Sequence, residues 1–332
     1  MYFMEIAQFA PVVIPTLNRY EHFKRCLESL ERCTWAEHTD VYVALDYPPS
    51  DKYVNGWKKI DDFLHEKEKG NGFKSLVVRR RDHNLGVGHP NSNSTLLLRE
   101  VKEMYDRYIF TEDDNEFAPN FLVYINKALT KFEDDDRILC VCGYNRRITL
   151  PESFKGNCYL ANDFVAWGVG YWTKRQRPQT YNSFDYLKQI LRDKEKYAKL
   201  RKDSPDSIRN IVTMLKVGKF HGDVLVNVYE TLEGKYSVMP TLSKVRNHGN
   251  DGTGLHSKTM VEDFDKYFSE QPIDEATDFE FDNTVPMQPE GLRTDDFGKL
   301  VPDWKKAVKY LIYRIDLFLI RRFGIVLHSK YI

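Results

Sequence analysis

The chain lacks an excess of charge of either sign. Its 332 residues carry 49 Lys and Arg against 49 Asp and Glu, so no net field draws it toward nucleic acid. It also lacks an apolar run of the ~18–20 residues that a spanning helix needs. Residues 1–11 show no basic start and no long apolar stretch of a signal peptide. We therefore expect a soluble, cytoplasmic protein without a nucleic-acid partner, or one that at most lies on the inner face of a membrane.

Cysteine is scarce and shows no pairing pattern. The five cysteines are an odd number and form no C-x-x-C pair, which argues against a disulfide framework. Cys140 and Cys142 alternate along a predicted strand, so both point to one face and are expected to fill the core. Buried thiols of this kind are typical of a reducing compartment.

The first half of the chain has alternating strands and helices. Hydrophobic runs predict strands, and apolar residues at helical spacing predict helices, one of them begun by Asn18 as N-cap with Glu21 in a capping box and another with Leu97, Val101 and Met104 facing inward. The predicted strands are 10–15, 40–46, 75–79, 108–111 and 138–142, the helix with Leu97, Val101 and Met104 spans 93–105, and one further helix spans 121–132. This alternation predicts an α/β fold with a mostly parallel sheet, whose ligands bind at the carboxyl ends of the strands.

The second half has a weaker pattern. Residues 174–210 are charged and predicted to be helical, 238–256 are predicted to be a loop, and 263–296 are predicted to wrap the surface. Residues 304–327 combine apolar residues at helical spacing with Lys and Arg, which predicts a basic amphipathic helix. This helix either lies on an anionic membrane surface or packs on the catalytic domain, and the sequence leaves both alternatives open.

Three consecutive acids, Glu112, Asp113 and Asp114, follow the predicted strand 108–111 without a basic neighbour. Close carboxylates repel one another by about 4 kcal/mol per pair at an effective dielectric constant of about 20, unless water or a cation intervenes. Hard divalent cations prefer carboxylate oxygens and often bridge to substrate phosphates. The run is therefore either a metal site at the edge of the sheet or a solvated acidic turn.

Four segments, taken in order, resemble one enzyme family. The segment FTEDDNEFAPNF (110–121) resembles the acidic motif of GT-A glycosyltransferases, particularly the N-acetylglucosaminyltransferase I type, and residues 11–30 resemble the first strand and helix of GT-A enzymes, including the inverting family 2. AWGVGYW (166–172) is similar to the acceptor-side loop of that fold. Residues 240–256 are similar to a later stretch of the N-acetylglucosaminyltransferase. The ordered set spans residues 10–256.

The resemblance implies a GT-A (Rossmann-like) fold, with a mixed, mostly parallel sheet flanked by helices and a C-terminal helical extension. The catalytic domain would span 1–260, with a nucleotide-sugar half at about 1–145 and an acceptor half at about 146–260, and the extension would span 261–332. The implied activity is transfer of a hexosyl or N-acetylhexosaminyl group from a nucleotide-sugar, with UDP expected, to an acceptor hydroxyl. Transfer would be inverting and dependent on Mn²⁺ or Mg²⁺. With a membrane-bound helix, the acceptor would be a lipid-linked glycan, as in bacterial surface-polysaccharide assembly.

The resemblance also assigns donor-binding roles. Pro15, Thr16 and Arg19 would line the nucleotide site. Asp46 would accept a hydrogen bond from the base, although a strand-end cap is the simpler interpretation of this residue. Asp113 would contact ribose or the donor sugar.

The resemblance places the metal on the acidic run. Asp114 would ligate the cation on the diphosphate, and Glu112 is the second candidate ligand of the run. His248 or His256 would complete the metal sphere or touch the diphosphate, and Arg246 would pair with phosphate. The other interpretation, and the usual one for a histidine in a loop, is a solvated polar residue.

Inverting transfer needs a base for the acceptor hydroxyl. Asp223 lies where the family has its catalytic carboxylate, and Asp163 is the competing candidate. A helix N-cap is the other interpretation of Asp223, and the tryptophan-flanked acidic pair of the family is absent around it.

Two other functions fit less well. A nucleotidyltransferase shares a similar sheet and metal carboxylates, but PTLNRYEHF (15–23) lacks its Gly-rich basic loop. A catalytically inactive carbohydrate-binding protein would keep the fold without turnover.

Overall fold

The computed structural model describes residues 8–254, 262–282, 284–294 and 303–327. Within these ranges the helices are α1 (Tyr20–Glu31), α2 (Asp51–Lys69), α3 (Asn93–Met104), α4 (Phe121–Lys131), α5 (Phe184–Arg192), α6 (Lys194–Asp203), α7 (Pro205–Val217), α8 (Gly222–Glu233), α9 (Glu262–Ser269) and α10 (Asp303–Phe323), with short 3-10 turns at Ala36–His38 and Gln179–Asn182. The strands are β1 (Val12–Thr16), β2 (Asp40–Leu45), β3 (Ser75–Arg80), β4 (Arg107–Phe110), β5 (Asn115–Phe117), β6 (Ile138–Cys142), β7 (Ile148–Thr149), β8 (Cys158–Ala161), β9 (Val169–Trp172), β10 (Tyr236–Pro240), β11 (Val245–Asn247) and β12 (Arg293–Thr294).

Eight strands form one mixed sheet in the order β3-β2-β1-β4-β9-β6-β10-β8. The pairs among β3, β2, β1 and β4 are parallel, as is the pair of β6 and β10, whereas β9 runs antiparallel to β4 and β6 and β8 runs antiparallel to β10. Two small ribbons, β5 with β11 and β7 with β12, complete the strands of the described residues. The predicted α/β fold with a mostly parallel sheet is therefore confirmed.

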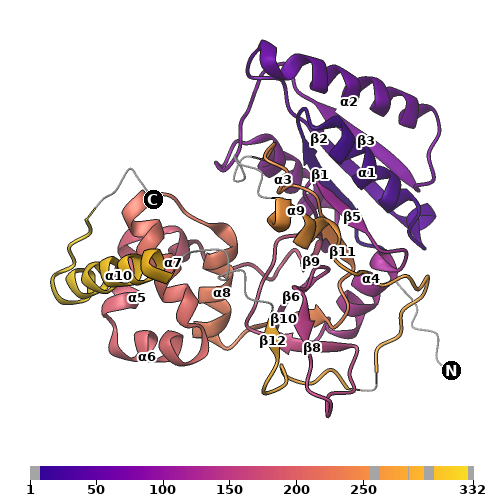
Figure 1. Ribbon diagram of the computed structural model, residues 1–332. Helices are drawn as coiled ribbons and strands as arrows, with labels where there is room; N and C mark the ends of the chain where they lie inside the picture. The colour runs from indigo at the N-terminus through magenta and orange to yellow at the C-terminus, as the bar shows by residue number, and fades with distance from the viewer. Residues whose placement is uncertain (1–7, 255–261, 283, 295–302, 328–332) are drawn as a thin grey trace.

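Helices cover both faces of this sheet. Val12 and Ile14 of β1 point into the main core with α1, α2 and α4, whereas Val13 points to the opposite face, where Leu97 of α3 packs. This alternation follows from the two-residue period of a strand. Figure 1 shows α1 and α2 beside β1–β3, with the helices α5–α8 and α10 grouped on the other side of the molecule.

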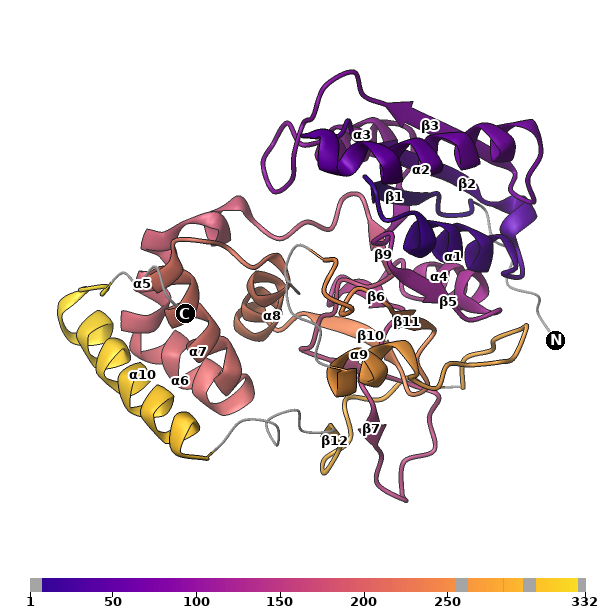
Figure 2. The ribbon, with the colours of Figure 1, turned by 45° about the horizontal axis from the view of Figure 1, so that its top comes forward.

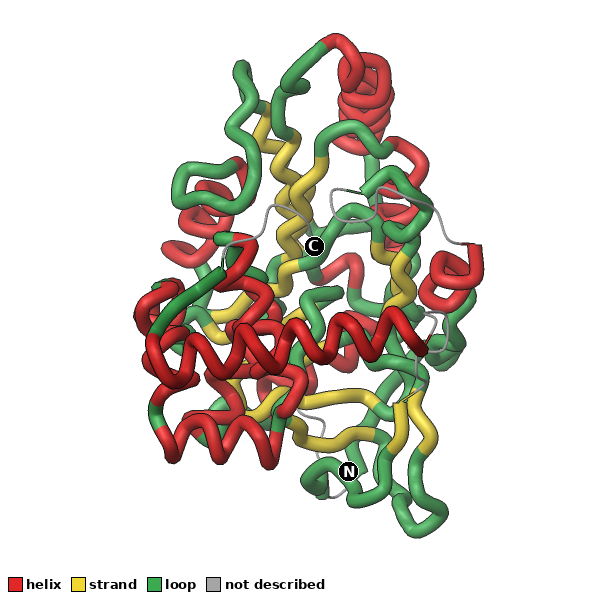
Figure 3. Tube along the Cα trace, turned by 60° about the vertical axis from the view of Figure 1, so that its left-hand side comes forward, coloured by secondary structure: helices red, strands yellow, loops and turns green. Residues whose placement is uncertain are grey.

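The helices α5–α8 and α10 have a hydrophobic core of their own. Its members come from all five helices and include Leu187, Leu200, Ile211, Val228 and Ile320. Figures 2 and 3 show these helices as a bundle beside the sheet, with α10 along its outer side in Figure 2. The predicted helical character of 174–210 is confirmed, but the sequence did not predict that a helix near the C-terminus would join this bundle.

Several local predictions were wrong. The first helix begins at Tyr20 with Arg19 as N-cap and no side-chain cap, so Asn18 does not cap it. Met104 is 51% exposed, because α3 ends there and only Leu97 and Val101 of the predicted triplet are buried. The predicted loop 238–256 begins within β10 and contains all of β11.

Other local predictions were right. All five cysteines are free and buried, as the absence of a pairing pattern predicted. Residues 271–282 run across α4, where Phe279 and Phe281 contact Tyr124 and the Lys127 ammonium donates to the carbonyl of Phe279, so the predicted surface wrap is present. No helix of the described residues is long and apolar enough to cross a membrane.

Candidate active site

The acidic run lies at the carboxyl edge of the parallel strands. β4 pairs with β1 through Val13 and Phe110, and the amide of Thr111 donates to the carbonyl of Val13. This pairing sets residues 112–114 beside Thr16, the last residue of β1, and beside the following loop, which carries Arg19. The position agrees with the place where α/β sheets bind ligands.

Arg19 joins the run by ion pairs. Its Nη2 donates to Asp113 Oδ1 and lies 2.8 Å from Asp114 Oδ2, and Thr16 Oγ1 donates to Asp113 Oδ2 over 2.8 Å. Burial by itself would lower the pKa of Arg19, but the charges of Asp113 and Asp114 outweigh it and raise the pKa above its ordinary value. The other terminal nitrogen, Nη1, is buried and has no hydrogen-bond partner among the described residues.

The carboxyl groups of the run hold more negative charge than Arg19 balances. Burial, followed by the charges of Asp114 and Asp113, raises the pKa of Glu112 to about 8, although a hydrogen bond from Trp167 opposes this. Burial also raises the pKa of Asp113, against the opposing charge of Arg19. Among the described residues, Arg19 is the cation that forms ion pairs with this run, so a further cation would be stabilised there.

Residues around β11 fix Asp114. Asn247 Nδ2 donates to Asp114 Oδ1 over 2.8 Å, and the amide of His248 donates to the carbonyl oxygen of Asp114 over 2.8 Å. A Cβ at Gly249 would overlap Asp114 Oδ2, so only glycine allows this close approach. The segment after residue 240, predicted to be a loop, therefore reaches the acidic run. Strand β11 within this segment positions it there.

The side chains of His248 and Arg246 point to Glu116 instead of Asp114. His248 Nε2 lies 2.7 Å from Glu116 Oε2, and Arg246 Nη1 lies 3.8 Å from Glu116 Oε1. The hydrogen bond from His248, with a smaller contribution from the charge of Arg246, lowers the pKa of Glu116. Arg246 also donates from Nε to the carbonyl of Gln271 over 2.6 Å. His256 lies outside the described residues.

The carboxylate ligands at this edge fit a metal cation that is also coordinated by a bound substrate. In the described part of the chain, no group of three or more His, Cys, Asp and Glu side chains converges as a metal cage. Mg²⁺ and similar hard cations are commonly held by one or two carboxylates together with substrate phosphates. Asp114 and Glu112 supply such carboxylates, and the unpartnered Arg19 Nη1 supplies a donor for a phosphate oxygen beside them.

Asp46 has partners inside the protein. Its carboxylate accepts from the amides of Leu85 and Gly86 over 2.9 and 3.0 Å and from Asn84 Nδ2 over 3.2 Å. The amide of Tyr47 donates to it as well, over 2.9 Å. Asp46 thus holds the loop after β3 against the end of β2, which is the structural role that the sequence also allowed. A nucleotide base would have to share these acceptor positions.

The remaining predicted residues lie in different places. Pro15 is half-buried in β1, opposite Ala44 of β2. Asp163, in the loop after β8, forms an ion pair with Arg146 over 2.5 Å. Asp223 is exposed in the first turn of α8, one residue inside the helix, whose N-cap is His221, so Asp223 is not the N-cap itself. The structure does not tie either aspartate to the acidic run by a contact.

The sequence analysis missed four residues that shape the site, namely Asn247, Gly249, Glu116 and Trp167. Gly249 carried a signal, because a glycine between polar residues often marks a close backbone approach. Trp167 lies in the predicted acceptor-side loop, where it contacts Tyr144 edge to face at 4.5 Å between ring centroids. Its side chain also lowers the pKa of Glu112, against the raising effect of burial, which relates this loop to the acidic run.

Comparisons with known proteins give partial likenesses. No family model matches the chain, and no curated protein matches it. Among solved structures it is similar to S. aureus TarS, with 13% identity and a TM-score of 0.32 over 63% of this chain and 43% of TarS. It is also similar to the mannosyltransferase PcManGT from Pyrobaculum calidifontis in complex with GDP-Man and Mn²⁺, with 12% identity and a TM-score of 0.34 over 68% of this chain and 74% of that one. The glycosyltransferase GlyE of Streptococcus pneumoniae matches with 10% identity and a TM-score of 0.29, over 69% of this chain and 44% of its own. A likeness of this size is partial, and no conclusion about activity or substrate follows from it.

Proposed function

We propose that this chain is a GT-A-type glycosyltransferase that moves a sugar from a nucleotide-sugar to an acceptor hydroxyl. The observation that carries the proposal is the acidic run Glu112–Asp114 at the carboxyl ends of β1 and β4, in which Asp113 and Asp114 are buried and paired with Arg19. The run has excess negative charge, and Arg19 keeps a buried donor free. A diphosphate with a divalent cation satisfies both needs at once. The ordered sequence motifs that resemble GT-A enzymes support the same activity.

The donor would lie across the edge of the sheet. Arg19 would donate from Nη1 to a phosphate oxygen, with Thr16 and Pro15 beside it, and Asp113 would contact ribose or sugar. Asp46 would meet the base while holding the loop 84–86. UDP as the nucleotide rests on the resemblance alone. Transfer of a hexosyl or N-acetylhexosaminyl group rests on it as well.

Asp114 would hold the Mn²⁺ or Mg²⁺ ion, with Glu112 as the second carboxylate. When bound, such an ion neutralises the charge that develops on the departing diphosphate. His248 and His256 are the further candidate ligands, and Arg246 is the further candidate for phosphate. In the described structure Glu116 holds both His248 and Arg246, so either would have to leave this partner to reach a donor.

Asp223 is the proposed base for inverting transfer, with Asp163 as its competitor. The acceptor oxygen forms a bond to the anomeric carbon while the bond from that carbon to the diphosphate oxygen breaks, and the carboxylate takes the hydroxyl proton. Exposure in the first turn of α8 leaves Asp223 free to meet an acceptor. Asp163 is engaged with Arg146, which would have to be displaced.

The wider proposal concerns the acceptor and its place. The acceptor would be a glycan or a lipid-linked glycan of bacterial surface-polysaccharide assembly, and the protein would be cytoplasmic and peripheral on the inner face of the membrane. Residues 1–260 would form the catalytic domain and 261–332 an extension. The bundle core that α10 shares with α5–α8 connects this extension to the catalytic part of the chain.

The test is a thermal-shift and calorimetric screen of nucleoside diphosphates and nucleotide-sugars, with and without Mn²⁺. A ligand that binds only the native state raises the melting temperature by mass action, so no acceptor is needed. We expect one class of nucleotide-sugar to stabilise the protein only when Mn²⁺ or Mg²⁺ is present. Hydrolysis of that donor, measured by nucleotide release, would follow.

The control is the Asp134→Ala variant, which removes an acid from the exposed acidic segment after α4. It should respond to nucleotide and Mn²⁺ like the wild type, whereas Asp114→Ala should lose the response. If the folded wild-type protein responds to no nucleotide under any metal condition, the proposed function is wrong.

A further inference from the structure

The helix α10 is anchored to the bundle by one face. Leu317 and Ile320 are buried in the core of the bundle, and Tyr313 packs against it. Asp316 is 3% exposed and forms an ion pair with Lys216 of α7. These contacts fix which side of α10 faces outward.

The opposite side of α10 is apolar and exposed. We call it the outer face of α10, and its residues are between 48% and 62% exposed: Val308, Leu311, Ile312, Ile315 and Phe318. Residues three and four apart lie on one side of a helix, so these side chains form a continuous stripe. An amphipathic helix of a soluble domain normally turns its apolar side to the core and its polar side to water. Here both sides carry large apolar residues, and a stripe of this kind marks an interaction surface.

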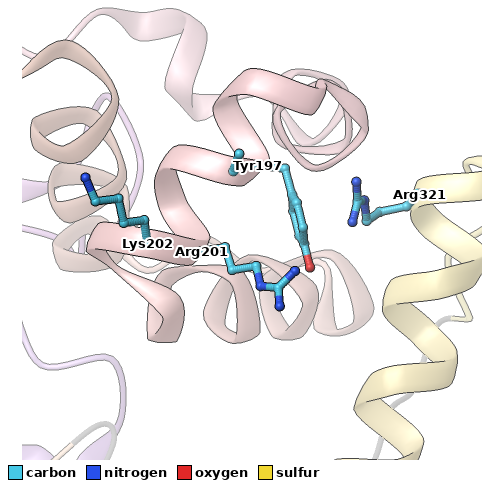
Figure 4. A pocket seen from close by; sticks show the side chains of 5 residues that line it. Tyr197, Arg201, Lys202 and Arg321 are labelled. Carbon is cyan, nitrogen blue, oxygen red and sulfur yellow. The ribbon is translucent and has the colours of Figure 1, made fainter.

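Basic residues are concentrated in the sequences of α6 and α10. α6 carries five Lys and Arg against two acids, and α10 carries six against two, although the chain as a whole is neutral. Between the two helices is a hollow of about 460 Å³, the basic hollow, lined by Tyr197, Ala198, Arg201, Lys202 and Arg321. Figure 4 shows the guanidinium of Arg321 opposite the ring of Tyr197, at 3.5 Å from the ring centroid, with Arg201 and Lys202 on the facing helix.

We propose that the outer face of α10 and the basic hollow dock the protein on an anionic phospholipid surface. Apolar side chains enter the boundary between headgroups and acyl chains, while Lys and Arg pair with lipid phosphates. A second copy of this chain fits less well as the occupant. It would cover the apolar stripe but would bring two basic surfaces together. The inference rests on the proposed function, for which it names the surface that meets the membrane.

The test is flotation of the full chain with vesicles of phosphatidylcholine, or of phosphatidylcholine mixed with phosphatidylglycerol. We expect recovery to rise about tenfold with the anionic lipid and to fall as salt is added. The outer-face variant Leu311→Ser/Ile315→Ser/Phe318→Ser should lose most of this binding. The charge variant Arg201→Gln/Lys202→Gln/Arg321→Gln, which changes three residues of the basic hollow, should lose the preference for anionic vesicles.

A matched control removes equally exposed apolar side chains elsewhere. The variant Met104→Ser/Leu242→Ser/Met287→Ser changes residues that are 51%, 43% and 48% exposed, and it should float like the wild type. The melting temperature of each variant establishes that it is folded. Stabilisation by nucleotide and Mn²⁺ is measured on the same samples and should be unchanged, because no substituted residue belongs to the candidate active site.

Two results would overturn the inference. One is equal recovery of the wild type and the outer-face variant with anionic vesicles. The other is a dimer of the wild type in sedimentation velocity without lipid that the outer-face variant dissociates, because the stripe would then be a subunit interface. Loss of vesicle binding together with intact nucleotide stabilisation leaves the proposed function standing. Vesicle binding without any nucleotide response contradicts the function and not the docking surface.

Discussion

The sheet edge buries charged side chains, whereas the bundle surface exposes both charged and large apolar side chains. At the sheet edge, Asp113 and Asp114 are buried, and neighbouring elements hold them in position. On the bundle, Lys and Arg side chains are largely exposed, and Leu311 and Phe318 of α10 are exposed with them. Burying a charge is unfavourable unless an opposite charge or a hydrogen bond compensates it. Exposing a large apolar stripe to water is also unfavourable unless another surface covers it. The difference is what we expect if, as proposed above, the first region binds a small charged ligand and the second meets an extended surface.

Removing Asp114 should have the largest effect. Asp114→Ala is expected to lower turnover about 10²–10⁴-fold, because a cation on the diphosphate stabilises the leaving group by several kcal/mol. The measurement is release of nucleotide from the donor found in the screen. Asp134→Ala should retain wild-type turnover. Equal turnover in both variants would remove the distinction between the buried run and an exposed acidic segment.

Replacing the base should be nearly as severe. Asp223→Asn is expected to lower transfer about 10²–10⁴-fold and to leave nucleotide-sugar binding intact, because the base acts only on the acceptor hydroxyl. Asp163→Asn should have a smaller effect on transfer, since its partner Arg146 already engages it. Transfer rates at saturating nucleotide-sugar, together with nucleotide-sugar binding measured by calorimetry, show which of the two variants loses transfer without losing binding. The reverse ranking would make Asp163 the base.

Removing the positive charge of Arg19 at the sheet edge should reduce the stability of the fold. Arg19→Met leaves buried carboxylates without their partner and is expected to lower the free energy of unfolding by about 3 kcal/mol. Mn²⁺ with nucleotide should restore part of the loss, because it supplies positive charge at the same carboxylates. Urea denaturation with and without these ligands measures both. A fully stable Arg19→Met protein would show that the acidic run needs no compensating charge.

The smallest expected effect lies where the bundle meets the sheet, at Glu230. This α8 residue is fully buried, accepts from the Ser237 hydroxyl over 2.7 Å, and leaves Oε2 without a partner among the described residues. Burial raises its pKa well above the ordinary value, with smaller contributions from Cys142 and Asp163. The folded state therefore keeps a proton that the unfolded state has lost, so the stability falls as pH rises above about 4.5 and toward the folded pKa.

Glu230→Gln removes this titration and keeps an acceptor for Ser237. Its stability relative to the wild type should grow between pH 5 and pH 9 by about 1 kcal/mol or more. Melting curves across that range measure the difference. The exposed control Glu152→Gln should follow the wild type at every pH. A constant offset between Glu230→Gln and the wild type would mean that Glu230 is ionised in the fold throughout.

Much of the first half was predictable from local pattern. The strands at 40–46, 75–79 and 138–142 and the helix at 121–132 lie within a residue or two of β2, β3, β6 and α4. Continuous apolar runs and helical periodicity act over a few residues, so the sequence alone carries them. The predicted helix start at Asn18 was wrong, since the helix begins at Tyr20 after Arg19, and Asn18 instead packs closely against Gly56 of α2, a residue distant in sequence.

By itself the sequence determined the alternating strands and helices, the buried free cysteines and the acidic run after the fourth predicted strand. Only the tertiary structure decided that Arg19 pairs with that run, that Glu116 holds His248, and that Gly249 brings the loop after β11 onto Asp114. It also decided which face of α10 is buried, since the helix has apolar residues on both sides and the packing against the bundle selects one of them. The physical reason is that hydrophobic periodicity is local, whereas the partner of a charge or of an apolar face is set by which elements the sheet and the bundle bring together.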